Sequence, residues 1–123
     1  MKEYKDFGEF VREKRNENHL TMRVFCKEIG ISTPFLTDVE SGRRNPFDIE
    51  KLNRMVEVLN LSSAEKDQMF DLAGKKRNTV APDLPEYIQG REYVGVALRK
   101  ARDLGASEEE WMQFVEELQK RRG

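Results

Sequence analysis

A single glycine between two short helical patterns constrains this chain more than any other feature of its sequence. Apolar side chains recur one helical turn apart on both sides of Gly30, over residues 24–29 and 35–39. Thr21 and Ser32 are residue types that favour helix N-caps, and glycine favours the left-handed conformation that ends a helix. A helix, a tight turn and a second helix are therefore predicted, which is the spacing of a helix-turn-helix unit. Such pairs occur in many folds, so the spacing by itself predicts a local structure and not a function.

The helical pattern continues through the rest of the N-terminal part. We predict helices over residues 7–18, 21–30, 32–42, 48–59 and 62–74. Ser62 and Glu65 form a capping box at the start of the last of these, and Gly74 is expected to end it. No strand pattern stands out. The prediction is an all-α fold whose first domain, residues 1–74, is a five-helix bundle.

The composition changes after this domain. Residues 75–82, KKRNTVAP, contain little to bury and finish on a helix breaker, so we predict a linker over residues 75–90. Residues 91–123 then carry two further helical stripes on either side of Gly105, which predicts a C-terminal helical hairpin. A hairpin of this size cannot bury its own apolar faces. We therefore expect it to pack on the first domain or on another chain.

Composition also excludes several classes of protein. A formal net charge of −1, from 22 basic and 23 acidic residues, argues against a protein that coats nucleic acid through bulk positive charge. A lone Cys26 and a lone His19 cannot form a disulfide or the usual zinc ligand set, and neither has a partner for catalysis. We therefore expect no metal, no cofactor and no enzymatic activity.

Two further stretches bear on location and chemistry. No apolar run approaches the roughly 20 residues that cross a bilayer, and the start of the chain lacks the apolar core of a signal peptide, so we expect a cytoplasmic protein without membrane contact. The acidic run Glu108, Glu109 and Glu110 falls in the first turn of a predicted helix, where negative charge favours the helix dipole. We interpret it as a helix start and not as a catalytic pair.

The order of residues in the N-terminal part resembles the Cro and cI phage repressor family, also called Xre. The residues that carry the resemblance are Arg15, Leu20, Thr21, Phe25, Cys26, Ile29, Gly30, Ile31, Ser32, Leu36, Val39, Glu40, Gly42, Arg43, Arg44, Asn45 and Pro46. The resemblance covers about residues 7–74. It implies a lambda-repressor-like bundle of five helices in which the second helix braces the DNA backbone and the third enters the major groove.

The resemblance also implies which residues hold the DNA backbone. Thr21 would place a hydroxyl and free backbone N–H groups at a helix N-terminus, where hydrogen bonds and the helix dipole hold a phosphate. Arg43, Arg44 and Asn45 follow the third helix, in a loop that lies along the sugar-phosphate backbone in the family. Met22 stands where the family often has glutamine, which removes one expected polar contact.

Base reading falls, by the same resemblance, to the start of the third helix. The residues concerned are Ser32, Thr33, Pro34, Thr37 and Asp38. This face departs from the family pattern because it lacks the arginine or glutamine that pairs in a bidentate way with guanine or adenine. The threonines offer a hydroxyl and a methyl group, and Asp38 can accept a hydrogen bond from a cytosine amine. We therefore expect modest direct readout.

Arg15 and Glu40 resemble the family's buried ion pair between the first and third helices; the other interpretation is two unrelated surface charges.

Together these features predict a sequence-specific, double-stranded-DNA-binding transcriptional repressor that acts as a homodimer. An alternative is an antitoxin or another partner-binding regulator, in which residues 91–123 bind a second protein and the helix-turn-helix serves autoregulation. Trp111 and Phe114 motivate this alternative. Whether the hairpin forms a dimer interface or Trp111 completes the monomer's core is left open.

Overall fold

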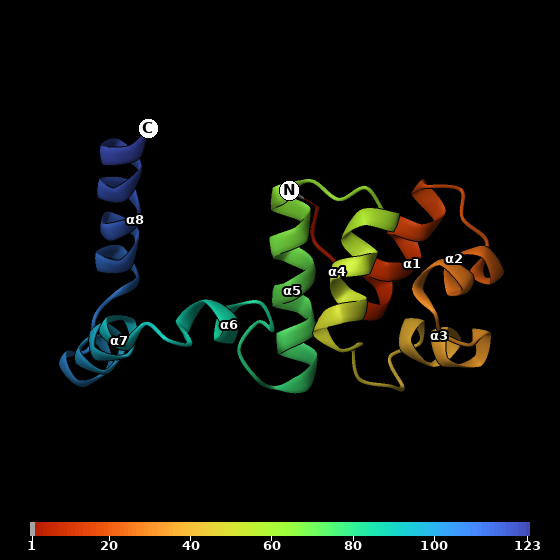
Figure 1. Ribbon diagram of the computed structural model, residues 1–123, viewed down its shortest axis with the longest axis horizontal. Helices are drawn as coiled ribbons and strands as arrows, with labels where there is room; N and C mark the ends of the chain where they lie inside the picture. The colour runs from red at the N-terminus through yellow and green to blue at the C-terminus, as the bar shows by residue number, and fades with distance from the viewer. Residues whose placement is uncertain (1) are drawn as a thin grey trace. The chain divides into compact units, whose positions relative to one another are not determined.

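The computed structural model describes residues 2–123, and every regular element in that range is an α-helix. The helices are α1 (Phe7–Glu17), α2 (Met22–Ile29), α3 (Thr33–Glu40), α4 (Ile49–Val58), α5 (Ser63–Arg77), α6 (Leu84–Ile88), α7 (Glu92–Leu104) and α8 (Glu108–Arg122). The chain divides into two compact units, the first ending at Glu86 and the second running from Tyr87 to Gly123. Figure 1 shows α1 to α5 gathered in the first unit. The predicted all-α class and five-helix bundle are confirmed.

The two helices of the central pair begin and end for the reasons that the sequence suggested. The Thr21 hydroxyl accepts a hydrogen bond from the Val24 backbone N–H at 3.2 Å, and the Ser32 hydroxyl accepts one from Phe35 at the same distance. Gly30 ends α2 with φ +85°, a left-handed conformation that glycine adopts without steric cost. Local capping therefore sets both helix starts and the turn between them.

A single apolar core holds the first unit together. Helix α1 packs on α3 and α5, while α2 packs on α3 and α4. The largest fully buried side chains come from all five helices: Phe7, Phe10, Val11, Phe25, Leu36, Val39, Leu52, Met55, Leu59, Met69 and Phe70. Because α3 contributes two of these residues, burial fixes which face of α3 points inward and which remains free for a ligand.

Helix α1 approaches α3 closely because Gly8 has no side chain. A Cβ atom at Gly8 would lie 2.4 Å from the carbonyl oxygen of Val39 and 2.8 Å from that of Glu40. Real Cβ atoms are not found this close to backbone oxygen atoms. The position of the last turn of α3 therefore depends on a glycine in another helix.

A largely buried lysine joins α1 to α5. The Lys14 side chain is only 9% exposed, and its ammonium group forms an ion pair with Glu65 and a second with Glu17 at 3.1 Å. Glu65 is also the residue that completes the capping box with Ser62 at the start of α5. One carboxylate thus satisfies both a nearly buried cation and a helix N-terminus.

Stability should fall in acid because of this carboxylate. The Lys14 hydrogen bond, followed by the Ser62 backbone N–H, holds the pKa of Glu65 below its ordinary value of 4.5. Because the pKa of Glu65 is lower in the folded state than in the unfolded state, the ionised carboxylate stabilises the fold above about pH 4.5. This stabilisation is lost as the pH falls through the folded-state pKa. Urea unfolding measured from about pH 7 to about pH 3 should show this loss. The Lys14→Met variant should be less stable than the wild-type protein near neutral pH, and its stability should fall by a smaller amount in acid. If the stabilities of the two proteins fall by the same amount, the pairing of Lys14 with Glu65 is not the cause of the acid sensitivity.

The end of α5 differs from the sequence-based prediction. Gly74 does not end the helix, which continues to Arg77, and Ala81 in the predicted linker is buried. A Cβ atom at Gly74 would lie 2.8 Å from backbone atoms of Val80 and Ala81, so the glycine serves the close return of the chain across α5. The predicted linker over residues 75–90 thus includes the last turn of α5 and an unpredicted short helix, α6. The two compact units divide after Glu86.

The second unit consists mainly of two amphipathic helices without a core of their own. Gly105 ends α7 in the left-handed conformation, and a capping box between Ser107 and Glu110 starts α8. Neither helix contains a buried residue. Trp111 is 39% exposed and Phe114 is 55% exposed, and their rings make an edge-to-face contact with centroids 6.4 Å apart. The apolar stripe of α8 is therefore free to contact another surface.

Candidate nucleic-acid interface

One arginine of α1 connects the two helices that form the candidate interface, α2 and α3. The Arg15 guanidinium group of α1 donates to both carboxylate oxygens of Glu40 at the end of α3, at 2.9 and 3.1 Å. A third bond, at 2.9 Å, goes to the backbone oxygen of Leu20, just before the α2 N-cap. The structure thus brings Arg15 and Glu40 together, with side chains only 11% and 7% exposed. Arg15 therefore ties the residue before the α2 N-cap to the end of α3.

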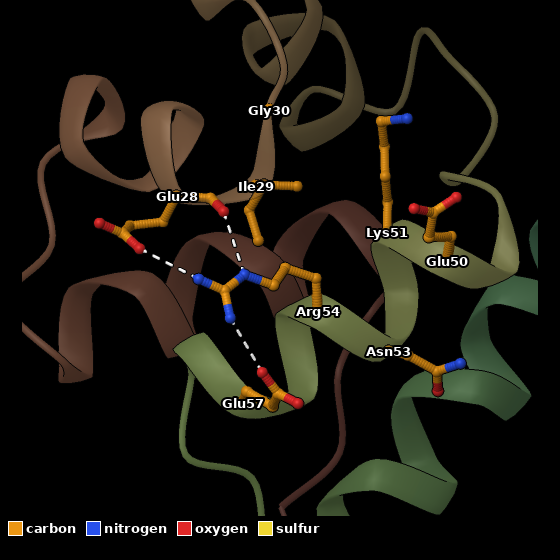
Figure 2. Close-up of a pocket in the computed structure, with 8 residues that line it drawn as sticks. All are labelled: Glu28, Ile29, Gly30, Glu50, Lys51, Asn53, Arg54 and Glu57. Atoms are coloured by element: carbon orange, nitrogen blue, oxygen red, sulfur yellow. Dashed lines mark hydrogen bonds and ion pairs between the residues drawn. The ribbon is translucent and has the colours of Figure 1, made fainter.

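A second arginine holds the other end of α2. Figure 2 shows Arg54 of α4 pointing between Glu28 and Glu57. It donates to the Glu28 backbone oxygen at 3.2 Å and contacts the carboxylates of Glu28 at 3.3 Å and Glu57 at 2.9 Å. A cation at a helix C-terminus compensates carbonyl groups that lack intrahelical partners. Both ends of α2 are therefore fastened by side chains from other helices.

The buried thiol of Cys26 stabilises the turn. Its Sγ atom donates to the Ser32 backbone oxygen at 3.5 Å, and burial raises the pKa of the thiol. A raised pKa keeps the thiol protonated and able to donate, and it lowers the reactivity of the sulfur. Cys26 therefore helps to position the start of α3.

Thr21 and Met22 occupy different environments at the start of α2. Thr21 is exposed, and the first backbone N–H groups of a helix lack intrahelical acceptors, so this end can accept an anion. Met22 is partly buried and packs against the core. Its side chain is therefore directed to packing, and its backbone N–H is the group that it offers at the start of α2.

The outward face of α3 carries small polar and apolar groups. Thr33, Pro34 and Thr37 are exposed, and Ser32 caps the helix beside them. The Thr37 hydroxyl donates to the Thr33 backbone oxygen at 3.1 Å, which leaves its methyl group and its lone pairs to meet a ligand. Thr33, Pro34 and Thr37 on this face carry no charge.

Asp38 binds both arginines of the loop that follows α3. Arg43 lies 3.2 Å from one of its carboxylate oxygens and Arg44 lies 3.6 Å from the other. The two arginine side chains are 67% and 50% exposed. In the free protein, Asp38 therefore orients the cations expected to hold phosphate, and its carboxylate is occupied by them. Asn45, the third loop residue expected to do so, is also exposed.

Sequence reasoning missed an aromatic support for this loop. The Arg44 guanidinium lies 4.6 Å from the ring centroid of Phe35, and Phe35 stacks on Phe47 with centroids 5.5 Å apart. Phe47 is only 4% exposed, so the stack leads from the core to the exposed cation. The sequence did contain a signal for this contact. It has an aromatic residue on the half-buried edge of α3 and an arginine in the loop that follows.

Two capped helices joined at Gly30, with an exposed face on the second and arginines in the next loop, define a DNA-binding helix-turn-helix unit. The helix-turn-helix domain family matches residues 6–69, about half of the chain. The chain therefore belongs to this family, and it is a helix-turn-helix transcriptional regulator, as its resemblance to Cro and cI predicted.

Individual relatives agree with this assignment. The chain is 34% identical over 61 residues to the ImmF control region 10 kDa protein of Bacillus phage phi105, which covers 50% of this chain and 67% of the phage protein. It is 34% identical over 56 residues to an uncharacterized HTH-type transcriptional regulator of Mycobacterium tuberculosis, covering 46% of this chain but only 39% of that relative. The second match therefore spans well under half of the mycobacterial protein.

Among solved structures, a chain of the SinR protein/SinI protein complex superposes with a TM-score of 0.48 at 16% sequence identity. The superposition covers 94% of this chain and 97% of that chain. Within residues 2–123, no helix combines the length and apolar character that a membrane crossing requires.

Proposed function

We propose that this regulator is a repressor that binds a specific double-stranded DNA sequence through α2, α3 and the loop after α3. The observation that carries the proposal is the position of Arg43 and Arg44, which are exposed and paired with the end of the outward face of α3. Phosphate-binding cations beside a helix that fits the major groove supply affinity and base contact on one surface. The proposed contact residues are Thr21, Met22 through its backbone N–H, Ser32, Thr33, Pro34, Thr37, Asp38, Arg43, Arg44 and Asn45.

Specificity on such a surface should come partly from the competition for Asp38. Asp38 becomes a stronger acceptor for a cytosine amine when its two arginines turn toward phosphates, because its carboxylate is then no longer paired with cations. Without DNA, the ion pairs keep these cations close to the protein. Binding then exchanges exposed ion pairs, each of which is worth little, for contacts with the DNA backbone.

Fluorescence anisotropy with labelled DNA from upstream of the protein's own gene, against scrambled duplex, tests the proposal across a salt series. Arg43→Ala should weaken binding and reduce the slope of log affinity against log salt by about one unit, because one phosphate contact is lost. Lys66→Ala removes an exposed cation from the first turn of α5 and serves as the matched control. Equal and weak binding to both duplexes would overturn the specific-binding proposal.

Repression has its own measurement. A reporter gene placed behind the bound DNA should be expressed more strongly with Arg43→Ala than with the wild-type protein. The opposite order would identify an activator.

We also propose that the second unit joins two copies of the chain through α8. The apolar residues Trp111, Phe114, Val115 and Leu118 are exposed at i, i+3, i+4 and i+7 spacing on this helix. Three acidic residues occupy its first turn and three basic residues its last. Antiparallel pairing of two α8 helices would place each acidic turn beside the basic turn of the other copy, which favours a second copy as the occupant of this face.

Sedimentation of the full-length chain tests this interface. The Trp111→Asp/Phe114→Asp variant should sediment as a monomer and should lose operator affinity, because two DNA-binding units no longer act together. Lys100→Asp, on an exposed position of α7, is the control for added negative charge. A wild-type chain that is already monomeric would contradict the homodimer and would favour the alternative, in which this apolar face binds a different protein as in antitoxins.

A further inference from the structure

Two basic residues at the end of α5 contact the loop that carries the proposed phosphate-binding arginines. The Lys76 ammonium group donates to the Gly42 backbone oxygen at 2.7 Å, and the Arg77 guanidinium group donates to the Pro46 backbone oxygen. Gly42 and Pro46 lie on either side of residues 43–45. Figure 1 shows the end of α5 and the loop after α3 at the same edge of the first unit. Two adjacent side chains therefore bind the loop at its two ends.

The loop has few other backbone contacts. Its first residues are held by bonds from Gly42 N–H to the Val39 oxygen at 3.1 Å and from Arg43 N–H to the Asp38 oxygen at 2.8 Å. In the part of the chain that the structure describes, no backbone-to-backbone hydrogen bond involves residues 44–47. The backbone of this second half is held by the bond from Arg77 to the Pro46 oxygen, and its side chains by the burial of Phe47 and the contacts of Arg44 with Asp38 and Phe35.

The fold of the α5 terminus explains why these side chains reach the loop. Helix α5 continues three residues past Gly74, and Asn78 then ends it with φ +59°. The chain returns across α5 at residues 80–81, where Gly74 leaves room for it. The last turn of α5, which lies beyond Gly74, is close enough to the loop for Lys76 and Arg77 to reach its carbonyl groups.

We propose that Lys76 and Arg77 are positioning residues for DNA binding: they hold the loop in the conformation in which Arg43 and Arg44 meet the phosphates. A loop that is ordered before binding loses less conformational entropy when it binds, which raises affinity without adding a contact. The inference rests on the proposed phosphate role of the loop. It assigns a function to residues whose composition alone is typical of a solvated linker.

Amide hydrogen exchange tests the first step without DNA. In the full-length Lys76→Met/Arg77→Met variant, exchange of the Gly42 and Arg43 amides, whose N–H groups bond to the Val39 and Asp38 oxygens, should become faster, while exchange in the core of α1 should stay unchanged. Lys75→Met is the matched control, because Lys75 is exposed on the same turn. Lys76→Arg/Arg77→Lys keeps both donors and should retain protection. Unchanged exchange in the Met variant would overturn the proposal.

DNA affinity in two backgrounds separates positioning from direct contact. Lys76→Met/Arg77→Met should weaken operator binding about tenfold in the otherwise wild-type chain, and by less than about twofold in a chain that already carries Arg43→Ala/Arg44→Ala. Equal weakening in both backgrounds would mean that Lys76 and Arg77 touch phosphate themselves, which overturns the positioning role. If Arg43→Ala/Arg44→Ala leaves DNA affinity unchanged, the proposed phosphate role of the loop is wrong. If that variant weakens binding but Lys76→Met/Arg77→Met does not, the loop binds DNA and only the positioning role of Lys76 and Arg77 is wrong.

Discussion

Replacing Glu40 by alanine should destabilise the DNA-binding unit by about 3 to 5 kcal/mol. The Arg15 side chain is only 11% exposed, and two of its three hydrogen bonds go to Glu40. Without the carboxylate, the guanidinium would stay in a poorly solvated site with the Leu20 oxygen as its one remaining partner. A loss of this size is a large part of the roughly 5 to 15 kcal/mol that stabilises a typical domain.

Urea unfolding of Glu40→Ala and of Glu50→Ala measures this effect. Glu50 is an exposed acidic residue in the first turn of α4, and its removal should cost less than about 1 kcal/mol. The Arg15→Met/Glu40→Met double variant removes both charges and should be more stable than Glu40→Ala, because no buried charge is then left unpaired. A midpoint for Glu40→Ala close to that of Glu50→Ala would show that the pair contributes little to stability.

Replacing Gly8 by alanine should cost about 1 to 3 kcal/mol, although alanine is the better helix former. The new methyl group would lie 2.4 Å from the Val39 carbonyl oxygen and 2.8 Å from that of Glu40. These oxygens belong to the backbone of α3, so no side-chain rotation can relieve the overlap. The last turn of α3 would have to move away from α1, which would also stretch the bond between Arg15 and Glu40.

Thermal or urea unfolding together with DNA anisotropy checks this prediction. Gly8→Ala should show a lower midpoint and a weaker operator affinity, because α3 and its following loop are displaced together. Arg12→Ala, on the exposed face of the same helix, should change neither property by much. If Gly8→Ala gains stability from its helix propensity, the close approach of α1 and α3 is less tight than the structure indicates.

Local signals in the sequence predicted the helices well because they act over a few residues. The capping hydroxyls of Thr21 and Ser32 bond to backbone groups three residues ahead, and Gly30 supplies a left-handed turn wherever the chain is placed. The resemblance to Cro and cI regulators then suggested the pairing of Arg15 with Glu40, which are 25 residues apart. That contact could not be derived from spacing alone, since it depends on how α1 crosses α3.

The same reasoning explains two of the places where sequence interpretation fell short. Gly74 has the composition of a helix stop, yet it is a point of close approach, and only the path of residues 80–81 reveals the difference. Phe35 has the spacing of a core residue, yet it also supports Arg44, which comes from the next loop. Both roles depend on segments that meet in space and have no periodic signature.

The sequence by itself determined the helix boundaries of the central pair, the class of the fold and the family of regulators to which the chain belongs. These follow from capping, periodicity and residue order, which are properties of short stretches. Only the tertiary structure decided that Asp38 holds both loop arginines and that Lys76 and Arg77 bind the loop from α5. The physical reason is that an ion pair or a hydrogen bond between elements requires a distance of a few ångströms, and packing of the core sets that distance.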